Sequence, residues 1–273
     1  LLGLELVLIG AYDDLDELVG IAPFFRRDLV TPLGLRVRRL HLMGNAWRVS
    51  PTVRTEYSSL IVRRKDASQI RKALMEAVAR WEWEECVACD LVELESHAME
   101  ENFRQSGLAV QKVVRMIDEG VRIDVSGEFE SWLKELGRNT RLKAYNRRNY
   151  LAQKGTLELE LCASDEFEAF LSMLNSFHRK RWGKPAFDEE AVKFHKNFKS
   201  RLLEWGGQVN CSFLNFGGKS VSVLYDVTIA GQRFNLQSGY LENFDKRVSL
   251  GALHLGFAIE ESFRDTRVTH YDL

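Results

Sequence analysis

The end of the sequence gathers residues that could bind an anion around a single turn. A strand-like run, Gln232 to Gly239, leads through a polar loop, Tyr240 to Ser249, into an apolar helix that opens with Leu250-Gly251. A helix that begins after such a loop offers free backbone N–H groups to an anion, most often a phosphate. Lys246 and Arg247 precede this turn and add positive charge. We therefore expect the turn to bind the phosphates of a nucleotide-type cofactor.

The individual residues of this turn have defined roles in that hypothesis. Gly251 and Ala252 would expose their amides to a pyrophosphate, and Ser249 would add a donor. Lys246 or Arg247 would neutralise the charge. The alternative is that Gly251 only lets the helix start and that both basic side chains are solvated, because a single glycine is a weak motif.

A second group of candidates lies on a helix predicted from Ser164 to Trp182. The 3–4 spacing of its apolar residues defines a buried stripe that continues onto His178 and Arg181. Polar residues on such a stripe need a partner, a ligand or a wet cleft. His178 could therefore orient a substrate or move a proton near neutral pH. The alternative is a histidine at the core edge, bonded to a backbone carbonyl.

A basic helix is predicted from Asn139 to Gln153. Its cations are Arg138, Arg141, Lys143, Arg147, Arg148 and Lys154. A solvated amphipathic helix is the default interpretation. The alternative is an anion-binding wall for the phosphates of a cofactor or of a substrate carrier. Tyr145 and Tyr150 would permit RNA contact, although the net charge of −1 argues against a nucleic-acid binder.

Other polar residues carry weaker signals. His254 falls on the polar edge of the last helix, where we expect it to be exposed rather than catalytic. Glu242 and Asp245 lie in the loop, where an acid or base would meet a substrate, but loop polarity alone also explains them. The pair Cys86 and Cys89 has no second metal-binding motif to complete it. We interpret the cysteine pair as part of a buried strand and expect no metal.

Composition limits the class of protein. With 273 residues, 45% of them hydrophobic and 28% charged, the chain is predicted to be globular, as one large domain or two small ones. No apolar run approaches the ~18 residues needed to span a bilayer. Four cysteines fit a reducing compartment, so we expect a cytoplasmic location. Because the chain opens in a strand pattern without Met or a signal-peptide pattern, we expect it to be a piece of a longer protein.

The elements that must position these residues fall into two halves, 1–120 and 121–273. The strands expected in the first half are 5–10, 18–25, 36–43, 57–62, 87–94 and 108–117, with helices over 67–83 and 98–105. The second half adds strands over 156–161, 208–216, 220–229, 232–239 and 268–273, with helices over 139–153, 164–182, 188–205 and 250–265. Both halves predict an α/β (α+β) fold of mixed sheets flanked by helices, and so a duplicated unit.

Several short segments together carry a family resemblance. They are Leu18–Phe25, Arg138–Arg148, Phe177–Gly183, Gln237–Tyr240, Ser249–Gly251 and Tyr271–Asp272. In this order they resemble the GNAT superfamily of acyl-CoA N-acyltransferases. Within it they are similar to the CelD-type, cellulose-biosynthesis-associated acetyltransferase-like family, which is related to FemAB-type tandem GNAT proteins.

The resemblance implies a tandem GNAT fold with the cofactor pyrophosphate on the loop from Arg247 to Ala252. Two departures from the family pattern stand out. Counted from Arg247, the fourth position is Leu250 and not glycine. The sequence also stops at Leu273, before a Gly-rich and Tyr-Lys segment of the family, so we expect the second domain to lack its C-terminal end.

The resemblance further implies transfer of an acyl group from acetyl-CoA or another acyl-CoA to an amine or hydroxyl. The acceptor would be a saccharide or a cell-envelope precursor. Backbone amides near Gln237, Ser238 and Gly239 would polarise the thioester carbonyl. His178 or Asp272 would position or deprotonate the acceptor, and Tyr240 would protonate the thiolate. The residues assigned to acceptor binding are Arg148, Arg181 and Trp182.

Two alternatives remain open on this sequence. One is a Fem-like transferase that takes an aminoacyl group from tRNA and holds the tRNA or lipid-linked phosphates on the helix Arg138 to Lys154. The other is a degenerate, non-catalytic GNAT module, which the imperfect phosphate loop favours. The sequence does not indicate the oligomeric state.

Overall fold

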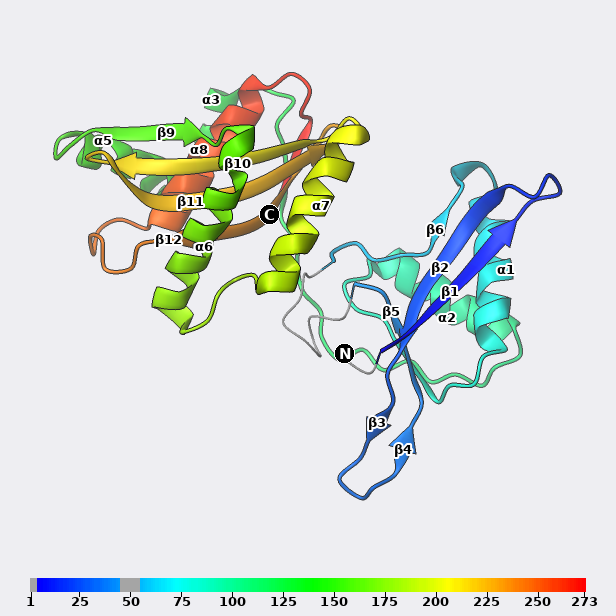
Figure 1. Cartoon of the computed structure of the whole chain (residues 1–273). Coiled ribbons are helices and arrows are strands. Elements are labelled where there is room, and N and C mark those ends of the chain that lie inside the picture. Colours follow the sequence, from blue (N-terminus) through cyan, green and yellow to red (C-terminus); the bar gives the residue numbers. More distant parts are fainter. Residues whose placement is uncertain (1–3, 45–54) are drawn as a thin grey trace. The chain divides into compact units, whose positions relative to one another are not determined.

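The computed structural model describes residues 4–44 and 55–273. The chain divides into two compact units, Leu1–Ile117 and Asp118–Leu273, which are described separately below (Figure 1).

The first unit is built on a five-stranded sheet. Its strands are β1 (Glu5–Tyr12), β2 (Leu18–Arg26), β5 (Arg39–Leu42), β6 (Ile61–Val62) and β7 (Glu85–Val87). The predicted β1–β2 hairpin is confirmed, with Leu6 opposite Phe25. Helices α1 (Ala67–Ala79) and α2 (Glu93–Gln105) complete the unit, and α1 buries Leu74 and Val78 against the sheet. A short hairpin of β3 (Leu29–Val30) and β4 (Arg36–Val37) projects from the end of β2 (Figure 1).

Several predictions for the first unit are wrong. The run 108–117, which the sequence predicts as a strand, forms none. A strand requires a neighbour to accept its backbone hydrogen bonds, and in the described part of the chain none pairs with this run. The strand predicted over 87–94 is reduced to β7, and its last residues already belong to α2. The predicted strand 57–62 is likewise reduced to β6.

The second unit contains a six-stranded sheet in the order β8-β13-β12-β11-β10-β9. The strands are β8 (Arg122–Asp124), β9 (Leu157–Leu161), β10 (Gln208–Phe216), β11 (Lys219–Ile229), β12 (Gln232–Tyr240) and β13 (His270–Asp272). Strands β12 and β13 are parallel, and the other pairs are antiparallel. Every strand and helix predicted for this half is present, with ends shifted by a few residues.

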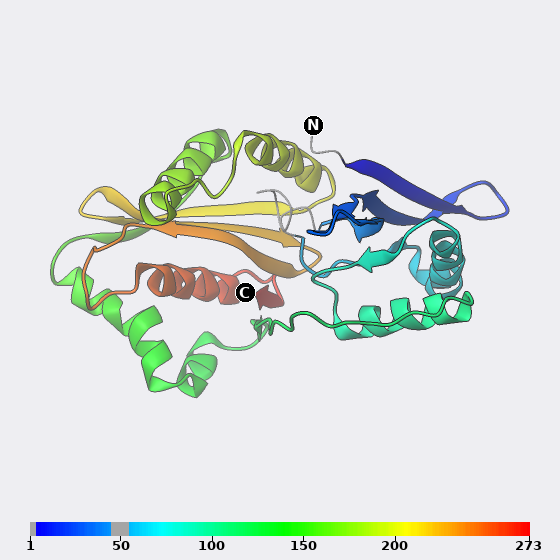
Figure 2. The same ribbon diagram turned by 90° about the horizontal axis from the view of Figure 1, so that it is seen from below.

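Helices cover both faces of this sheet (Figure 2). α6 (Phe167–Trp182) and α7 (Glu189–Glu204) lie on one face, and α8 (Leu250–Arg264) lies on the other. The apolar stripe of α6 is buried as its spacing predicts, and His178 is buried with it. Both faces of the central strands are therefore packed, which explains the continuous run of buried residues in β11.

The predicted basic helix is a composite that packs on α8. It consists of α4 (Arg138–Arg141), a π-helical turn (Leu142–Asn146) and α5 (Arg147–Ala152), and it follows α3 (Phe129–Glu135). A Cβ atom on Gly256 of α8 would lie 2.3 Å from the carbonyl oxygen of Ala144. Only glycine permits this close approach of the two backbones.

The order β12–α8–β13 creates an open strand edge. Strand β13 pairs with β12 only from Gln232 to Phe234. Within the described residues no strand continues this ladder, so the later part of β12, which ends in Tyr240, has a β13-facing edge without a strand neighbour. Among the helices described, none is both long and apolar enough to cross a bilayer.

Candidate functional site

Ser238 turns its backbone groups toward the open edge of β12. Its N–H donates to Oε1 of Gln237 at 3.0 Å, and its carbonyl oxygen accepts from His178. In an antiparallel ladder the two groups of one residue point the same way, so both point away from β11. A register shift opposite Tyr225 and Asp226 forms a β-bulge in β12 just before Gln237. Bulges of this kind re-aim the strand and are common beside active sites.

His178 reaches this edge from the last turns of α6. Its Nε2 lies 2.8 Å from the carbonyl oxygen of Ser238. A carbonyl only accepts, so Nε2 carries the proton and Nδ1 keeps the lone pair. Burial lowers the pKa of His178, and the Arg181 cation lowers it further, while the bond to Ser238 opposes the shift. The imidazole is therefore neutral near pH 7.

Arg181 and Trp182 extend the site at the end of α6. Nη1 of Arg181 donates to the hydroxyl oxygen of Tyr240, and Nε lies 3.3 Å from Oε1 of Glu242. The guanidinium carbon of Arg181 lies 4.4 Å from the ring centre of Trp182 and 4.7 Å from that of Tyr240. The Trp182 ring also lies 4.5 Å from the His178 ring. Four of the predicted site residues therefore contact one another in a chain that runs from His178 through Trp182 and Arg181 to Tyr240.

Tyr240 links this set to the start of α8. A Cβ atom on Gly251 would lie 3.0 Å from Cε1 of Tyr240, so the ring lies directly against this glycine. The Ser249 side chain makes no capping hydrogen bond, and the first turn of α8 contains no acidic residue. The amides of Gly251 and Ala252 precede the first intrahelical bond, which Leu253 donates to Ser249. The corner thus retains free donors and a favourable helix dipole.

Cations and one carboxylate surround the ring of Tyr150, beside the loop that precedes α8. Arg247 lies 4.5 Å and Lys154 4.4 Å from the ring centre, and Arg147 lies 5.8 Å away. Asp245 accepts from the Tyr150 hydroxyl at 2.8 Å and pairs with Lys154 at 3.2 Å. The bond from the Arg247 backbone N–H, and then those from Tyr150 and Lys154, lower the pKa of Asp245 to about 2. Asp245 therefore offsets part of the positive charge here, while Lys246 is exposed beside it.

Two predicted residues lie apart from the set at the end of α6. Arg148 pairs with Glu260 on α8, and its guanidinium carbon lies 3.5 Å from the Phe257 ring centre. It thus lies on the α8 side of the sheet, opposite to α6. Asp272 is buried and in register with Phe234, four residues before Ser238. That separation is about 13 Å along the strand.

His254 corrects the sequence prediction, because it is fully buried rather than exposed. Its ring nitrogens lie 2.9 Å from the hydroxyls of Ser212 and Ser222, and the Ser222 hydroxyl also donates to the carbonyl of Gly239. Burial lowers the pKa of His254 to about 3. The serines lie on β10 and β11, far from His254 in sequence, so helical spacing alone cannot reveal them. In the sequence, the one sign that His254 is buried is the apolar residue on either side of it.

Sequence reasoning also missed a buried polar cluster at the start of β12. Asp226 accepts hydrogen bonds from Asn235 at 2.8 Å and from the Tyr271 hydroxyl at 2.7 Å. Burial raises the pKa of Asp226 to about 6, although both donors oppose the shift. In the sequence, the one sign of this cluster is Asp226, a single aspartate within the largely apolar strand β11.

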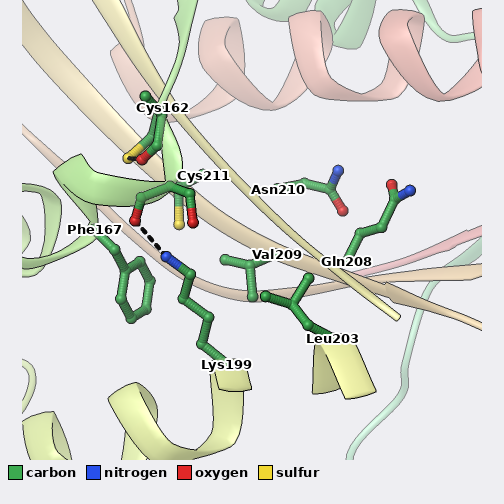
Figure 3. Close-up of a pocket in the computed structure, with 10 residues that line it drawn as sticks. Cys162, Phe167, Lys199, Leu203, Gln208, Val209, Asn210 and Cys211 are labelled. Atoms are coloured by element: carbon green, nitrogen blue, oxygen red, sulfur yellow. Dashed lines mark hydrogen bonds between the residues drawn. The ribbon is translucent and has the colours of Figure 1, made fainter. Parts of the chain in front are cut away.

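A pocket of about 230 Å³ lies elsewhere, between α7 and the strands β9 and β10 (Figure 3). Cys162, Cys211 and Lys199 line it, and Lys199 donates to the Ser164 carbonyl at 2.5 Å. None of the residues predicted to bind cofactor or acceptor lines this pocket. Burial raises the pKa of both thiols, so neither is activated as a nucleophile.

The comparison with protein families agrees with this geometry. The acetyltransferase (GNAT) domain model matches residues 138–273, a range that contains α6, β12, α8 and β13. The second unit therefore contains a GNAT-type acyltransferase domain. A comparison with curated protein sequences found no match.

Solved structures share the fold at low sequence identity. FemX has a TM-score of 0.57 and 11% identity, over 99% of this chain and 79% of that chain. A C-terminal domain assigned to a lysylphosphatidylglycerol synthetase from Agrobacterium fabrum has a TM-score of 0.51 and 8% identity, over 97% of this chain and 69% of that chain. L-PGS from Bacillus licheniformis has a TM-score of 0.50 and 13% identity, over 91% of this chain and 67% of that chain.

Proposed function

We propose that the second unit transfers an acyl group from an acyl-CoA to an amine or hydroxyl. The observation that carries this proposal is the contact of Tyr240 with both Arg181 and Gly251. This contact joins the open edge of β12, where a thioester can lie, to the start of α8, where a diphosphate can bind. In keeping with the CelD-type resemblance, the acceptor would be a saccharide or cell-envelope precursor, and the reaction would occur in the cytoplasm.

The thioester would lie along the open edge of β12. The Ser238 N–H is held by the side chain of its own neighbour Gln237, so a thioester carbonyl can replace that side chain without breaking the sheet. The N–H would then stabilise the oxyanion that forms when the acceptor attacks. The new bond joins acceptor and carbonyl carbon, and the bond to sulfur breaks.

Proton transfers would complete the reaction. The acceptor must lose a proton, and Nδ1 of His178 is the ring nitrogen with a free lone pair in this tautomer. Asp272 lies opposite Phe234, about 13 Å along β12 from Ser238, so it would instead bind a remote part of the acceptor. The leaving thiolate must gain a proton, and the Tyr240 hydroxyl is the donor that we assign to it. Arg181 and Trp182 would orient the acceptor.

The cofactor-binding residues follow from the same placement. The amides of Gly251 and Ala252 would bind the diphosphate with Ser249, and Lys246 and Arg247 would neutralise it. Arg148 would act indirectly, because its pairing with Glu260 holds the basic helix against α8.

A thermal-shift panel tests this proposal. Acetyl-CoA, longer acyl-CoAs and tRNA are each added to the full chain, because a ligand that binds the native state raises the unfolding midpoint. We expect acyl-CoA to raise the midpoint and tRNA not to. Absence of a shift with every acyl-CoA and with tRNA would leave the degenerate module as the better account.

A second candidate is Fem-like transfer of an aminoacyl group from tRNA. The observation that favours it is the cluster of Arg147, Lys154 and Arg247 around Tyr150, since cations beside an aromatic ring suit RNA phosphates and bases. The fold shared with FemX is compatible with it. Salt-dependent tRNA binding, together with no shift by acyl-CoA, would select this candidate.

A further inference from the structure

The β3–β4 hairpin of the first unit exposes an uncharged, apolar tip. The seven residues from Leu29 to Leu35 contain no charged side chain. Leu33 is 86% exposed, and Val30 and Leu35 are 65% and 64% exposed. The hairpin projects beyond the strands and helices of its own unit (Figure 1). Contiguous exposed apolar groups of this kind mark an interaction surface.

Three backbone N–H groups of this tip donate hydrogen bonds to acceptors within the tip. Thr31 N–H donates to the Leu35 carbonyl at 2.8 Å, and Gly34 N–H donates to the Thr31 carbonyl at 2.9 Å. Leu35 N–H donates to the Thr31 hydroxyl oxygen at 3.1 Å. Pro32 has no N–H to satisfy. Moving such a tip from water into hydrocarbon therefore exposes few unpaired donors, which is the main cost for non-helical backbone in lipid.

Charged residues begin at the base of the hairpin. The arginines there are Arg26, Arg27, Arg36, Arg38 and Arg39. They are not free charges: Asp28 pairs with Arg26 at 3.0 Å and with Arg36 at 2.6 Å. Arg38 pairs with Glu82 and Glu84, and Arg39 pairs with Glu85. The Arg36 side chain is 73% exposed, and Arg38 pairs with Glu82, which is 81% exposed. Because ion pairs open to solvent are weak, these two guanidinium groups can exchange them for lipid phosphates.

We propose that this hairpin inserts its tip into a lipid bilayer surface, with the arginines at the level of the phosphates. The tip is convex, so it fits a yielding hydrocarbon layer without a matching groove. Three residues of extended chain measure about 10 Å, so Leu33 lies at most that far beyond Val30. Interfacial protein segments reach a similar depth of about 5–10 Å. Peripheral attachment of this kind is independent of the acyl-transfer proposal and requires no membrane-spanning helix.

Vesicle flotation of the full chain tests the insertion. Vesicles of phosphatidylcholine alone and of an equimolar mixture with phosphatidylglycerol are compared, and the double variant L33D/L35D is tested beside wild type. Leu15→Asp is the matched control, because Leu15 is 81% exposed in the other hairpin turn of the same unit. Both variants change exposed side chains, so folding should be preserved, which circular dichroism checks.

We expect wild type and L15D to float with both kinds of vesicle, and L33D/L35D to bind at least about tenfold more weakly. Three results would overturn the proposal. Wild type that stays unbound is one, and equal flotation of L33D/L35D is another. The third is self-association in sedimentation velocity that the double variant abolishes while vesicle binding is absent, since that would identify a second copy of the chain as the partner.

Discussion

His178 and His254 hold neighbouring carbonyls of β12 from opposite faces of the sheet. His178 donates directly to the Ser238 carbonyl from α6. His254 acts from α8 through Ser222, whose hydroxyl donates to the Gly239 carbonyl. Because the Ser222 hydrogen is used there, Nδ1 of His254 donates to Ser222 and Nε2 accepts from Ser212.

The two histidines differ in what remains available to a substrate. Burial lowers the pKa of both side chains, so a lowered pKa does not distinguish them. Both nitrogens of His254 are occupied within the core. His178 uses only Nε2 and lies beside Arg181 and Trp182 at an open strand edge. We therefore propose a role in stability for His254 and a role in chemistry for His178, and the following variants test that division.

The largest effect is expected from His254→Ala. The change removes a buried ring and leaves the hydroxyls of Ser212 and Ser222 without their partner. We expect the free energy of unfolding of the second unit to fall by about 3 kcal/mol, measured by urea denaturation. His97→Ala, at an exposed position on α2, is the control and should be neutral. A loss below about 1 kcal/mol for His254→Ala would show that the core does not depend on this histidine.

The next effect is expected from His178→Ala. Removing the imidazole should lower kcat/KM about a hundredfold, or about 2.7 kcal/mol, because the acceptor loses its proton acceptor. CoA release is measured with the best acceptor of an amine and alcohol panel. His178→Gln keeps an N–H donor for Ser238 and should retain Tm without restoring turnover. If His178→Ala unfolds the unit, or if His178→Gln restores activity, His178 is structural.

Acid should destabilise the second unit through His254. Its folded pKa of about 3 lies below the unfolded value of 6.5, so the unfolded chain takes up the proton first. Stability is complete above pH 6.5 and falls as pH decreases toward 3. Between pH 7 and pH 5 this one group should remove about 2 kcal/mol. Denaturation midpoints of wild type and His254→Ala, measured from pH 7 to pH 5, give the contribution of His254 to this loss of stability. If the midpoints of both proteins fall equally with pH, His254 does not cause the loss.

The smallest effect is expected from Tyr240→Phe. This change removes the hydroxyl that accepts from Arg181 but keeps the ring against Gly251. Turnover should fall about tenfold because the thiolate loses its proton donor, while the Kd for CoA stays unchanged. Loss of CoA affinity with unchanged kcat would instead assign the hydroxyl to binding.

The sequence predicts the second unit far better than the first. Its strands β10, β11 and β12 and its helices α6, α7 and α8 are long. The stripe that leads from Phe177 to His178 is buried as expected. In the first unit the residues 108–117 are predicted as a strand but pair with no strand of the described residues, and Val113 and Ile117 remain 67% and 83% exposed. Periodicity describes one segment, whereas a strand depends on a neighbour that periodicity does not specify.

The candidate site shows the same limit. The turn at Gly251 and the position of His178 follow from local patterns. The partners of His254 and Asp226 could not be predicted, because they lie on other strands and meet only after the sheet forms. Arg148 matches the family pattern in sequence, yet its guanidinium pairs with Glu260 on α8.

The central claim is that amides at the start of α8 bind the diphosphate of an acyl-CoA. Amide chemical shifts of the full chain, recorded with increasing acetyl-CoA, test it most directly. The account predicts that the resonances of Gly251 and Ala252 shift and saturate, while that of Gly217 in the β10–β11 turn does not move. Saturable binding that leaves Gly251 and Ala252 unchanged, or no binding at all, would contradict it.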